Sequence, residues 1–462
     1  MIHGTDSPRF ALALLTFAYL CFFPSLLFAE EKTWHVTQET LPNGLQVVML
    51  EDHRAPVVTL QVWYKVGSRN ERLGITGISH LLEHLMFRGT PKYGQGEFSR
   101  LVQGRGGSHN AFTADDHTVY FENVAAPHIA LLLELEADRM ANLKLDETSF
   151  SAERNIVMEE RRMRTADEPV ADLYEQVSAA AYTAHPYGWP VVGWMGDLER
   201  MTLADVKAYR QLFYAPNNAI LVIAGDISPE ALVPKIKATF GAIPAGAATP
   251  KVRSEEPPQR GERRVTLKRP ASLPLYVTAY HVPNLKSEDS FPLALLSVVL
   301  AGGRSSRLQT SLVERKALVL DADADYDRSS QDPPLFTLSM RLAPGKRVQD
   351  AERALYQEVE LLKRKRVSTK ELERAKNLVE SSFVYGQDSI FYRAMQLGEY
   401  ASLGDWELIL KFIPGIRAVS AADLQRVAKT YLREENRTVG ILIPEGKPVR
   451  ERPSGAASGP VH

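Results

Sequence analysis

Runs of apolar residues recur along the chain and predict the strands of a sheet. Two of them extend from Val57 to Val66 and from Leu335 to Leu342. A further strand is expected from Asn110 to Phe121, where aromatic and polar residues alternate after a Gly106-Gly107 turn. The segment from Ser151 to Glu160 instead follows the helical period and predicts a helix.

One helix-strand pattern occurs twice. Thr202 to Val206 leads through a helix to an apolar strand at Ile220 to Ala224, and Ser420 to Leu424 leads likewise to Val439 to Ile443. The copies are roughly 218 residues apart, the size of one domain. The repeat predicts two similar halves, because 462 residues are too many for one simple core. Chance similarity between two amphipathic units is the alternative.

The first 29 residues differ from the rest of the chain. A single Arg9 is followed by an apolar run from Phe10 to Ala29, which predicts a secretory leader cleaved after Ala29. A small residue is usual at the third position before a cleavage site, and Leu27 at that position is larger. A retained membrane anchor is the alternative. The location expected is the periplasm or the exterior. An organelle import leader would carry more Arg residues.

Composition places the domain boundaries. The stretch between the halves is rich in Pro, Gly and charge, and the end of the chain has almost no apolar residues. The predicted parts are a signal peptide at 1–29, an N-terminal domain at 30–245, a linker at 246–262, a C-terminal domain at 263–445 and a disordered tail at 446–462.

Charge and cysteine content narrow the function further. The 55 Lys and Arg residues nearly balance the 56 Asp and Glu residues and are interspersed with them, so nothing indicates a nucleic-acid partner. The one cysteine, Cys21, lies in the leader with no small residue before it, which argues against lipid attachment. The mature chain would then contain no internal disulfide and would depend on core burial.

The segment His80-Leu81-Leu82-Glu83-His84 has the spacing of a catalytic zinc site. On a helix, residues i and i+4 emerge on one face about 6 Å apart, close enough for His80 and His84 to bind one metal ion. Glu83 lies within reach of a metal-bound water, and the order inverts the commoner HExxH motif. A chance His pair on an amphipathic helix is the alternative.

A third ligand is expected on the helix at Ser151 to Glu160. Glu153, Ile156, Val157 and Glu160 form one stripe, and carboxylates on an inward stripe need a cation. Glu159 is offset from this stripe, so Glu160 is the predicted third ligand, with Glu153 holding a ligand His from behind. A solvated charged helix is the alternative.

These motifs identify the chain as resembling the pitrilysin family of inverted zincins, which includes insulin-degrading enzyme and mitochondrial processing peptidase. The resemblance covers nearly all of the chain after the leader. It rests on the metal motif and Glu153-Arg154-Asn155, and on the segments Leu41-Pro42-Asn43-Gly44-Leu45, Gly106-Gly107-Ser108-His109-Asn110-Ala111-Phe112-Thr113, His185-Pro186-Tyr187-Gly188, Tyr214-Ala215-Pro216-Asn217-Asn218 and Gly225-Asp226.

The resemblance implies a fold and an activity. The fold class would be α+β, with two homologous domains that each pack helices on a mostly antiparallel sheet and face each other as a clamshell. The activity would be that of a Zn²⁺-dependent endopeptidase in which Glu83 is general base and acid. An extended peptide substrate would pair with the edge strand at Asn110, Ala111 and Phe112.

One departure from the family pattern predicts a partner. Family members that work alone carry an Arg and a Tyr that hold substrate, at positions occupied here by Val313 and Leu320. Neither side chain can donate a hydrogen bond, so a homologous sister chain without the metal motif is expected to supply these groups. A shifted alignment, or a substitute such as Arg307 or Arg315, is the alternative.

A second class of function is a scaffold subunit of a larger complex, as some relatives of the family are. The intact set of His80, Glu83, His84 and Glu160 favours a peptidase. A buried carboxylate cluster without a use is costly to retain, so a scaffold would be expected to lose at least one of these groups.

Overall fold

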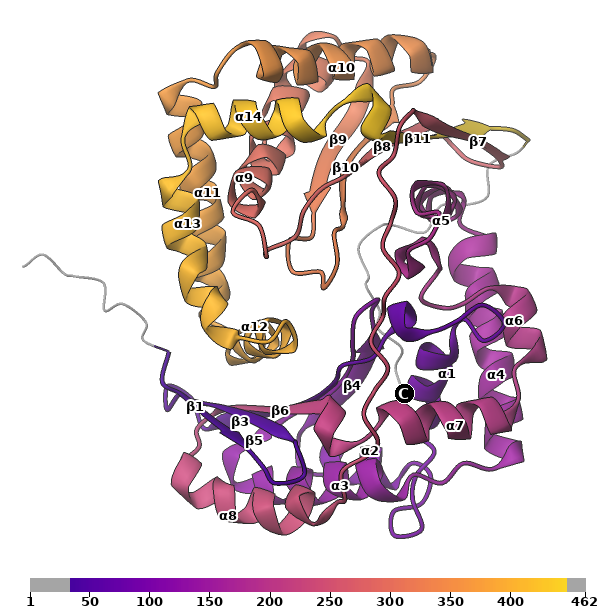
Figure 1. Cartoon of the computed structure of the whole chain (residues 1–462), viewed down its shortest axis with the longest axis vertical. Helices are drawn as coiled ribbons and strands as arrows, with labels where there is room; N and C mark the ends of the chain where they lie inside the picture. The colour runs from indigo at the N-terminus through magenta and orange to yellow at the C-terminus, as the bar shows by residue number, and fades with distance from the viewer. Residues whose placement is uncertain (1–33, 447–462) are drawn as a thin grey trace, which may run out of the picture. The chain divides into compact units, whose positions relative to one another are not determined.

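The computed structural model describes residues 34–446 and places their strands in two sheets (Figure 1). The predicted leader and most of the predicted tail lie outside the described residues. The first sheet contains β1 (Val36–Thr40), β2 (Gln46–Glu51), β3 (Val57–Tyr64), β4 (Ser108–Thr113), β5 (Thr118–Ala125) and β6 (Ala219–Gly225). The second contains β7 (Arg263–Arg269), β8 (Leu275–His281), β9 (Val319–Tyr326), β10 (Leu335–Leu342) and β11 (Arg437–Pro444).

The second sheet repeats the strand order of the first, without a counterpart of β1. Their orders are β1-β2-β6-β3-β5-β4 and β7-β11-β8-β10-β9, so that β4 and β9 occupy equivalent edges. In each sheet one pair is parallel, β2 with β6 and β7 with β11, and the other pairs are antiparallel. The expected class, α+β with two similar domains, is confirmed.

The helix before β6 and the helix before β11 begin in the same way. Thr202 and Ser420 each cap a helix, and each forms a capping box with an Asp three residues later. These are the two copies of the repeat seen in the sequence. The same local signal therefore starts the same helix-strand unit in both halves.

Helices surround both sheets. The first half contains α1 (Ile78–Leu85), α2 (Glu97–Gln103), α3 (Ile129–Asn142), α4 (Glu147–Arg161), α5 (Pro169–Ala181), α6 (Met195–Arg200), α7 (Leu203–Phe213) and α8 (Pro229–Thr239). The second contains α9 (Ser290–Ala301), α10 (Val348–Arg364), α11 (Thr369–Gly386), α12 (Ile390–Ser402), α13 (Phe412–Ala418) and α14 (Ala421–Tyr431). Short 3-10 turns are η1 (Ser68–Asn70), η2 (Ala126–His128), η4 (Pro186–Gly188), η5 (Pro216–Asn218), η6 (Phe240–Ala242), η8 (Trp406–Lys411) and η9 (Glu434–Asn436), and π turns are η3 (Arg162–Ala166) and η7 (Gln309–Arg315).

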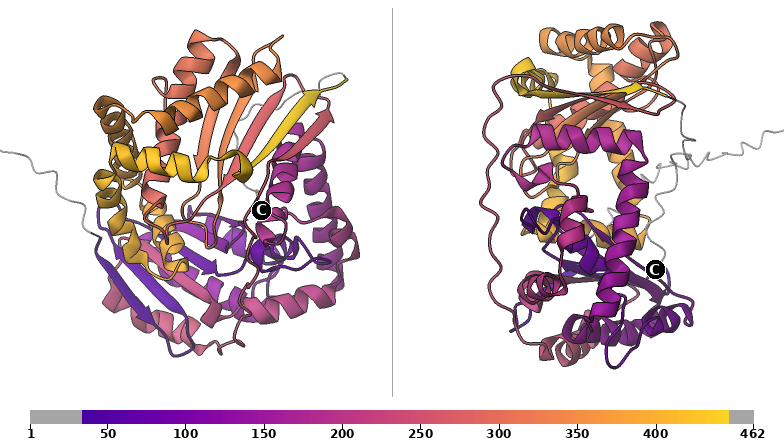
Figure 2. Two further views of the ribbon diagram at one scale, coloured as in Figure 1. Left: turned by 45° about the horizontal axis from the view of Figure 1, so that its top comes forward. Right: turned by 90° about the vertical axis from the view of Figure 1, so that its right-hand side faces the viewer.

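Each half contains one helix that packs on the sheet of the other half. Helix α5 packs on β7, β8 and β11, and burial of Leu173 and Val177 against Val277 and Leu442 gives this contact its own apolar core. Helix α12 packs on β2, β3 and β6 of the first sheet. Helices α9, α10 and α14 of the second half lie near its own sheet (Figure 1), and Figure 2 gives two further views. The exchange was not expected from the sequence.

The segment expected as one strand from Asn110 to Phe121 is a hairpin, so this prediction is wrong. Strand β4 ends at Thr113 and β5 begins at Thr118, with the Ala114 N–H donating to the His117 carbonyl across the turn. The reason lies in Asp115 and Asp116, since Asp residues favour turns and interrupt the alternating pattern.

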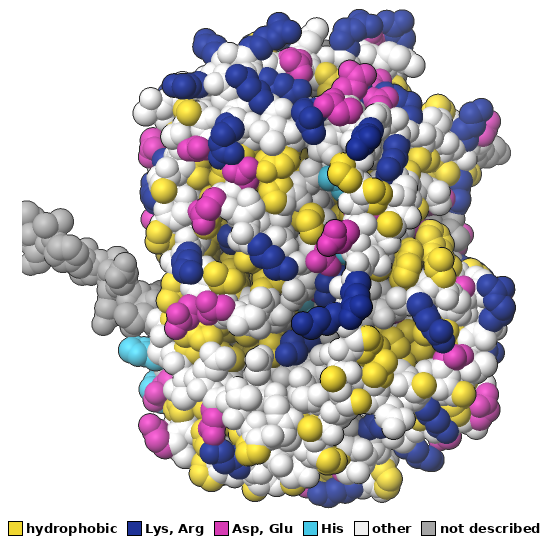
Figure 3. Space-filling view, in the orientation of Figure 1, with side chains coloured by type: hydrophobic (Ala, Val, Ile, Leu, Met, Phe, Trp, Pro, Cys, Tyr) yellow, Lys and Arg dark blue, Asp and Glu magenta, His cyan; other side chains and the backbone are white. Residues whose placement is uncertain are grey.

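Charge is spread over the surface. On the face shown in Figure 3, Lys and Arg side chains lie among Asp and Glu side chains in both the upper and the lower part. Within residues 34–446, none of the helices is both long enough and apolar enough to cross a bilayer. The predicted linker at 246–262 forms no helix or strand.

Candidate metal centre

Helix α1 is held at its first turn by buried groups. Gly77 precedes it with φ +86°, where an added Cβ would meet the backbone at Val192 and Gly193. The carboxylate of Glu71 accepts hydrogen bonds from the N–H groups of Gly77 and Ser79, at 2.7 and 2.9 Å. Burial raises the pKa of the Glu71 carboxyl to about 8. The two hydrogen bonds that it accepts satisfy N–H groups at the start of α1 and fix where the helix begins.

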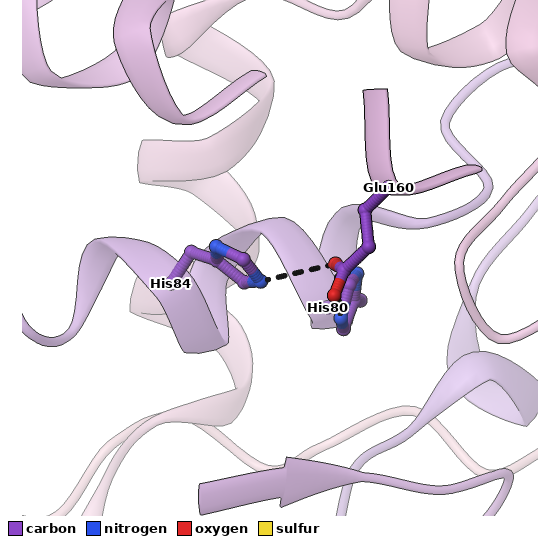
Figure 4. A group of neighbouring side chains, drawn as sticks. All are labelled: His80, His84 and Glu160. Carbon is purple, nitrogen blue, oxygen red and sulfur yellow. Dashed lines mark ion pairs between the residues drawn. The ribbon is translucent and has the colours of Figure 1, made fainter. Parts of the chain in front are cut away.

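The side chains of His80, Glu83 and His84 on α1 are all buried. Helix α4, which starts at its N-cap Asp146, packs against α1 and brings Glu160 to them. Figure 4 shows the carboxylate of Glu160 reaching the two imidazoles. Its Oε2 lies 3.5 Å from Nε2 of His80 and 3.5 Å from Nε2 of His84.

These distances fit a zinc ion. Zinc binds His nitrogen and carboxylate oxygen at about 2.0–2.2 Å in a tetrahedron, whose ligand atoms are then about 3.4 Å apart. One ligand atom from each of His80, His84 and Glu160 lies within 4.8 Å of the other two. The pKa of the Glu160 carboxyl is lowered to about 2, because the two histidines and Arg164 outweigh its burial. Glu160 is therefore the anion that a metal ligand must be.

A carboxylate behind His84 sets the orientation of that ring. The Oε2 atom of Glu153 lies 3.0 Å from His84 Nδ1, and its other oxygen pairs with Arg88. Donation of the Nδ1 proton to Glu153 directs the Nε2 lone pair of His84 toward Glu160. Glu153 thus lies behind His84, as the sequence predicts.

Glu83 has one oxygen held and one available. The Thr113 hydroxyl, at the end of β4, donates to Glu83 Oε2 at 2.6 Å. Among the described residues no group donates to Glu83 Oε1. Burial raises the pKa of the Glu83 carboxyl above its ordinary value, more than the Thr113 hydrogen bond lowers it. A raised pKa makes the Glu83 carboxylate a stronger base.

Strand β4 forms one edge of the first sheet, beside β5 only. The Ala111 N–H donates to the side-chain Oδ1 of Asn110 at 2.9 Å instead of to a neighbouring strand. That N–H therefore points to the open edge, where an added strand could reach it. Phe112 differs from these two residues, because its ring packs edge-on against Trp63 and His117.

Val313 and Leu320, which the resemblance aligns with the family's Arg and Tyr, lie in the second half. Val313 is in η7, and Leu320 is in β9, the edge strand equivalent to β4. Of the two substitute arginines, Arg307 pairs with Glu371 at 2.6 Å, and Arg315 donates to the Thr310 carbonyl. Neither contact places an Arg beside the centre.

Reasoning from the sequence missed three residues of the centre. Arg164 lies four residues after Glu160 and pairs with it, so helical spacing could have indicated it. Arg88 follows the end of α1 and pairs with Glu153 of α4, a contact that spacing does not indicate. Thr113 could not be found in this way. Its contact with Glu83 joins a strand to a helix and depends on the tertiary fold.

Comparison with known proteins shows the family of the chain. Residues 46–193 match the family model "Insulinase (Peptidase family M16)", and residues 200–379 match "Peptidase M16 inactive domain". His80, Glu83, His84 and Glu160 all lie in the first match. The zinc protease PqqE of Helicobacter pylori is 34% identical over 409 residues, which cover 88% of this chain and 92% of that protein.

Two solved structures have the same fold as this chain. A protease from Helicobacter pylori superposes with a TM-score of 0.86 at 33% identity, over 89% of this chain and all of that one. A peptidase M16 inactive domain from Pseudomonas fluorescens has a TM-score of 0.81 at 18% identity, over 90% and 99% of the two chains, and shares the fold. The chain therefore belongs to peptidase family M16.

Proposed function

We propose that this chain is a zinc-dependent endopeptidase that cleaves extended peptides or unfolded segments. The observation that carries the proposal is the meeting of His80, His84 and Glu160 beside the buried carboxyl of Glu83. Three ligands of this kind leave a position for water, as catalytic zinc sites require. The relative PqqE is named a zinc protease, which supports the same activity.

The proposed chemistry divides between the metal and the chain. Zinc bound by His80, His84 and Glu160 would polarise the scissile carbonyl and lower the pKa of a water molecule. Glu83 accepts the proton of that water on Oε1, while Thr113 holds Oε2 in place. Glu83 then donates the proton to the leaving amine. Glu153 keeps the His84 ring in the ligating orientation throughout.

The edge of β4 suits the substrate class. A peptide in extended form can add to this edge and displace the Asn110 side chain from the Ala111 N–H. Main-chain pairing depends little on the side chains of the substrate. The first requirement is therefore that the substrate segment be unfolded. We place Asn110 and Ala111 in direct contact with substrate, and Phe112 beside them.

A homologous sister chain is part of the proposal. Val313 and Leu320 cannot donate the side-chain hydrogen bonds that an Arg and a Tyr would, and Arg307 is already paired with Glu371. Family M16 includes chains described as inactive domains, such as the Pseudomonas fluorescens structure. A chain of that kind would supply the missing donors in a heterodimer.

We propose the periplasm or the exterior as the location, because the sequence begins with an apolar run that resembles a secretory leader. Fractionation followed by N-terminal sequencing tests this. A mature chain starting at Glu30 supports cleavage, whereas the full-length chain in the membrane fraction supports the retained anchor.

Hydrolysis of a quenched fluorescent peptide by the purified, zinc-loaded chain tests the proposed function. Glu83→Gln is expected to bind zinc and peptide and to lose roughly 10³-fold or more in kcat, because it cannot accept the proton. Retention of substantial activity by that variant would refute the assigned role of Glu83.

The same assay with a co-expressed sister chain tests the heterodimer. Activity only in the pair would establish a divided site. Strong Glu83-dependent activity of the chain alone would remove the need for a partner. No hydrolysis in either case, with zinc bound, would favour the alternative of a non-catalytic scaffold or binding subunit.

A further inference from the structure

Three arginines follow Glu160 closely, and each has a different acidic partner. Arg161 is buried, forms two hydrogen bonds with the partly buried Glu175 and lies over the Trp194 ring. Arg162 pairs with Glu159 at the surface, 3.0 Å apart. Arg164 is the one that reaches the metal centre, and its side chain is 44% exposed.

Arg164 lies just beyond the end of α4. Helix α4 ends at Arg161 and continues as the π turn η3, which holds one more residue in each turn than an α-helix does. Arg164 lies in this turn, and its NH2 group is 2.6 Å from Oε1 of Glu160. Arg164 and Glu160 are four residues apart, so both side chains lie on the same side of the helical chain and can pair.

The two oxygens of Glu160 have different neighbours. Oε2 lies between the histidines, 3.5 Å from each Nε2, while Oε1 faces Arg164. We infer that Arg164 is a positioning residue that keeps Glu160 Oε1 away from the metal, so that Glu160 binds through Oε2 alone. This inference rests on the proposed metal site and on no assumption about substrate or partner.

The consequence for catalysis follows from coordination chemistry. A carboxylate that binds through both oxygens occupies an extra position on zinc, and this position is the one that water or the substrate carbonyl needs. A cation on the second oxygen also withdraws charge from the ligand, and a less negative ligand set leaves zinc the stronger Lewis acid. Arg164 would therefore lower zinc affinity and raise turnover.

Loss of Arg164 should therefore tighten zinc binding, whereas a substitution that only disrupted the site would weaken it. Arg164→Met frees Oε1 and removes a positive charge, so zinc should bind roughly 3- to 10-fold more tightly. Turnover should fall roughly tenfold with little change in KM. A salt bridge with only a structural role would give weaker or unchanged zinc binding when it is broken.

The experiment combines metal affinity with a coordination readout on the full chain. The metal-free protein is titrated with zinc against a competing chelator, and a second sample is loaded with cobalt(II), whose visible bands weaken as its coordination number rises. Arg164→Met should show tighter zinc binding and weaker cobalt bands, and Arg164→Lys should lie between it and the native chain. Arg162→Met removes the same charge from the same turn and should match the native chain.

Unchanged cobalt bands, or zinc binding that is unchanged or weaker in Arg164→Met, would overturn the inference. Circular dichroism verifies folding, and Arg164→Lys decides the question if the Met variant does not fold. Both metal measurements remain informative if the chain has no peptidase activity. Failure of the inference and failure of the proposed function can therefore be told apart.

Discussion

Single side chains at the centre act through their neighbours. Glu153 accepts from His84, and its other oxygen is paired with Arg88. It is buried, so this orientation is not shared with water. Hydrogen bonds of this kind fix a ligand ring and make it a stronger donor to metal. The contribution of Glu153 should therefore be visible in zinc affinity, before any activity is measured.

Glu153→Gln is predicted to weaken zinc binding by roughly 10- to 100-fold, because a neutral amide polarises the His84 ring less and leaves Arg88 without its anion. Competition with a zinc chelator measures the effect. Glu159→Gln is the matched control on the same helix, since Glu159 is exposed and pairs only with Arg162 among the described residues. Native affinity in Glu153→Gln would contradict the assignment.

Thr113→Val is predicted to lower kcat roughly tenfold while zinc content stays the same, because the isosteric side chain cannot donate to Glu83 Oε2. Steady-state kinetics and metal analysis of the same sample measure this. Thr113→Ser keeps the hydroxyl and should recover most of the activity. Equal activity in the Val and native proteins would exclude a positioning role for Thr113.

At this scale much of the centre can be predicted from the sequence. His80, Glu83 and His84 share one helix turn, and Glu153 and Glu160 share one face of another helix, so local spacing groups them. Helical spacing does not show which residues of a helix face are buried. Ile156 belongs to the same predicted stripe as Glu153, yet its side chain is 47% exposed. Which part of a helix face is covered depends on the elements packed against it.

At the scale of elements, helix α12 shows how closely the halves approach. Its Gly398 lies on the indole of Trp63 in β3, so closely that an added Cβ would collide with the ring. Phe391 of α12 packs against Phe121 of β5, with ring centroids 4.9 Å apart. Arg393 pairs with Asp52 at 2.7 Å, and both side chains are buried.

Gly398→Ala is predicted to lower the free energy of unfolding by about 1–3 kcal/mol, because the methyl group must displace Trp63 or α12. Thermal or denaturant unfolding measures it. Gly94→Ala is the control, because a Cβ there would meet nothing within 4 Å. A variant at 398 as stable as the native chain would mean that α12 does not pack this tightly in solution.

Element prediction succeeded where the signal is local. Both repeat units begin with a side-chain cap and end in an apolar strand, and the strand expected at Leu335 to Leu342 has the same bounds in the structure. The exchange of α5 and α12 leaves no comparable signal. An apolar helix face shows that a helix is covered, but not which half covers it.

At the scale of the whole molecule, a polar network joins the two halves. Asp332, just before β10, accepts from Arg69 at 2.5 Å and lies 3.1 Å from His185 Nε2. Arg69 also pairs with Asp116. Glu256 of the predicted linker accepts from the N–H groups of residues 183–185, which lead into the same loop.

The network should make the contact between the halves sensitive to acid. The His185 hydrogen bond, with help from Arg69, lowers the pKa of the Asp332 carboxyl to about 2, whereas an unfolded Asp titrates near about 3.9. Because the pKa of Asp332 is lower in the folded chain than in the unfolded chain, the ionised carboxylate stabilises the fold above about pH 4. This stabilisation is lost as the pH falls toward 2.

Asp332→Asn is therefore predicted to be less stable than the native chain at neutral pH, with the difference shrinking as the pH falls from about 4 to about 2. Denaturant unfolding of both metal-free proteins across this range measures it. Asp321→Asn, which removes a partly exposed pair with Arg341 inside the second sheet, serves as control. A difference that does not change with pH would contradict this account.

The exchange of helices bears on how the molecule could be divided. Because α5 lies on the second sheet and α12 on the first, the halves contact each other directly as well as through the connecting chain. Cutting the backbone near Pro250, where there is neither helix nor strand, would leave two polypeptides that still complete one another. The same protein could thus be encoded as two genes, and either product made alone would expose an apolar sheet face and tend to aggregate.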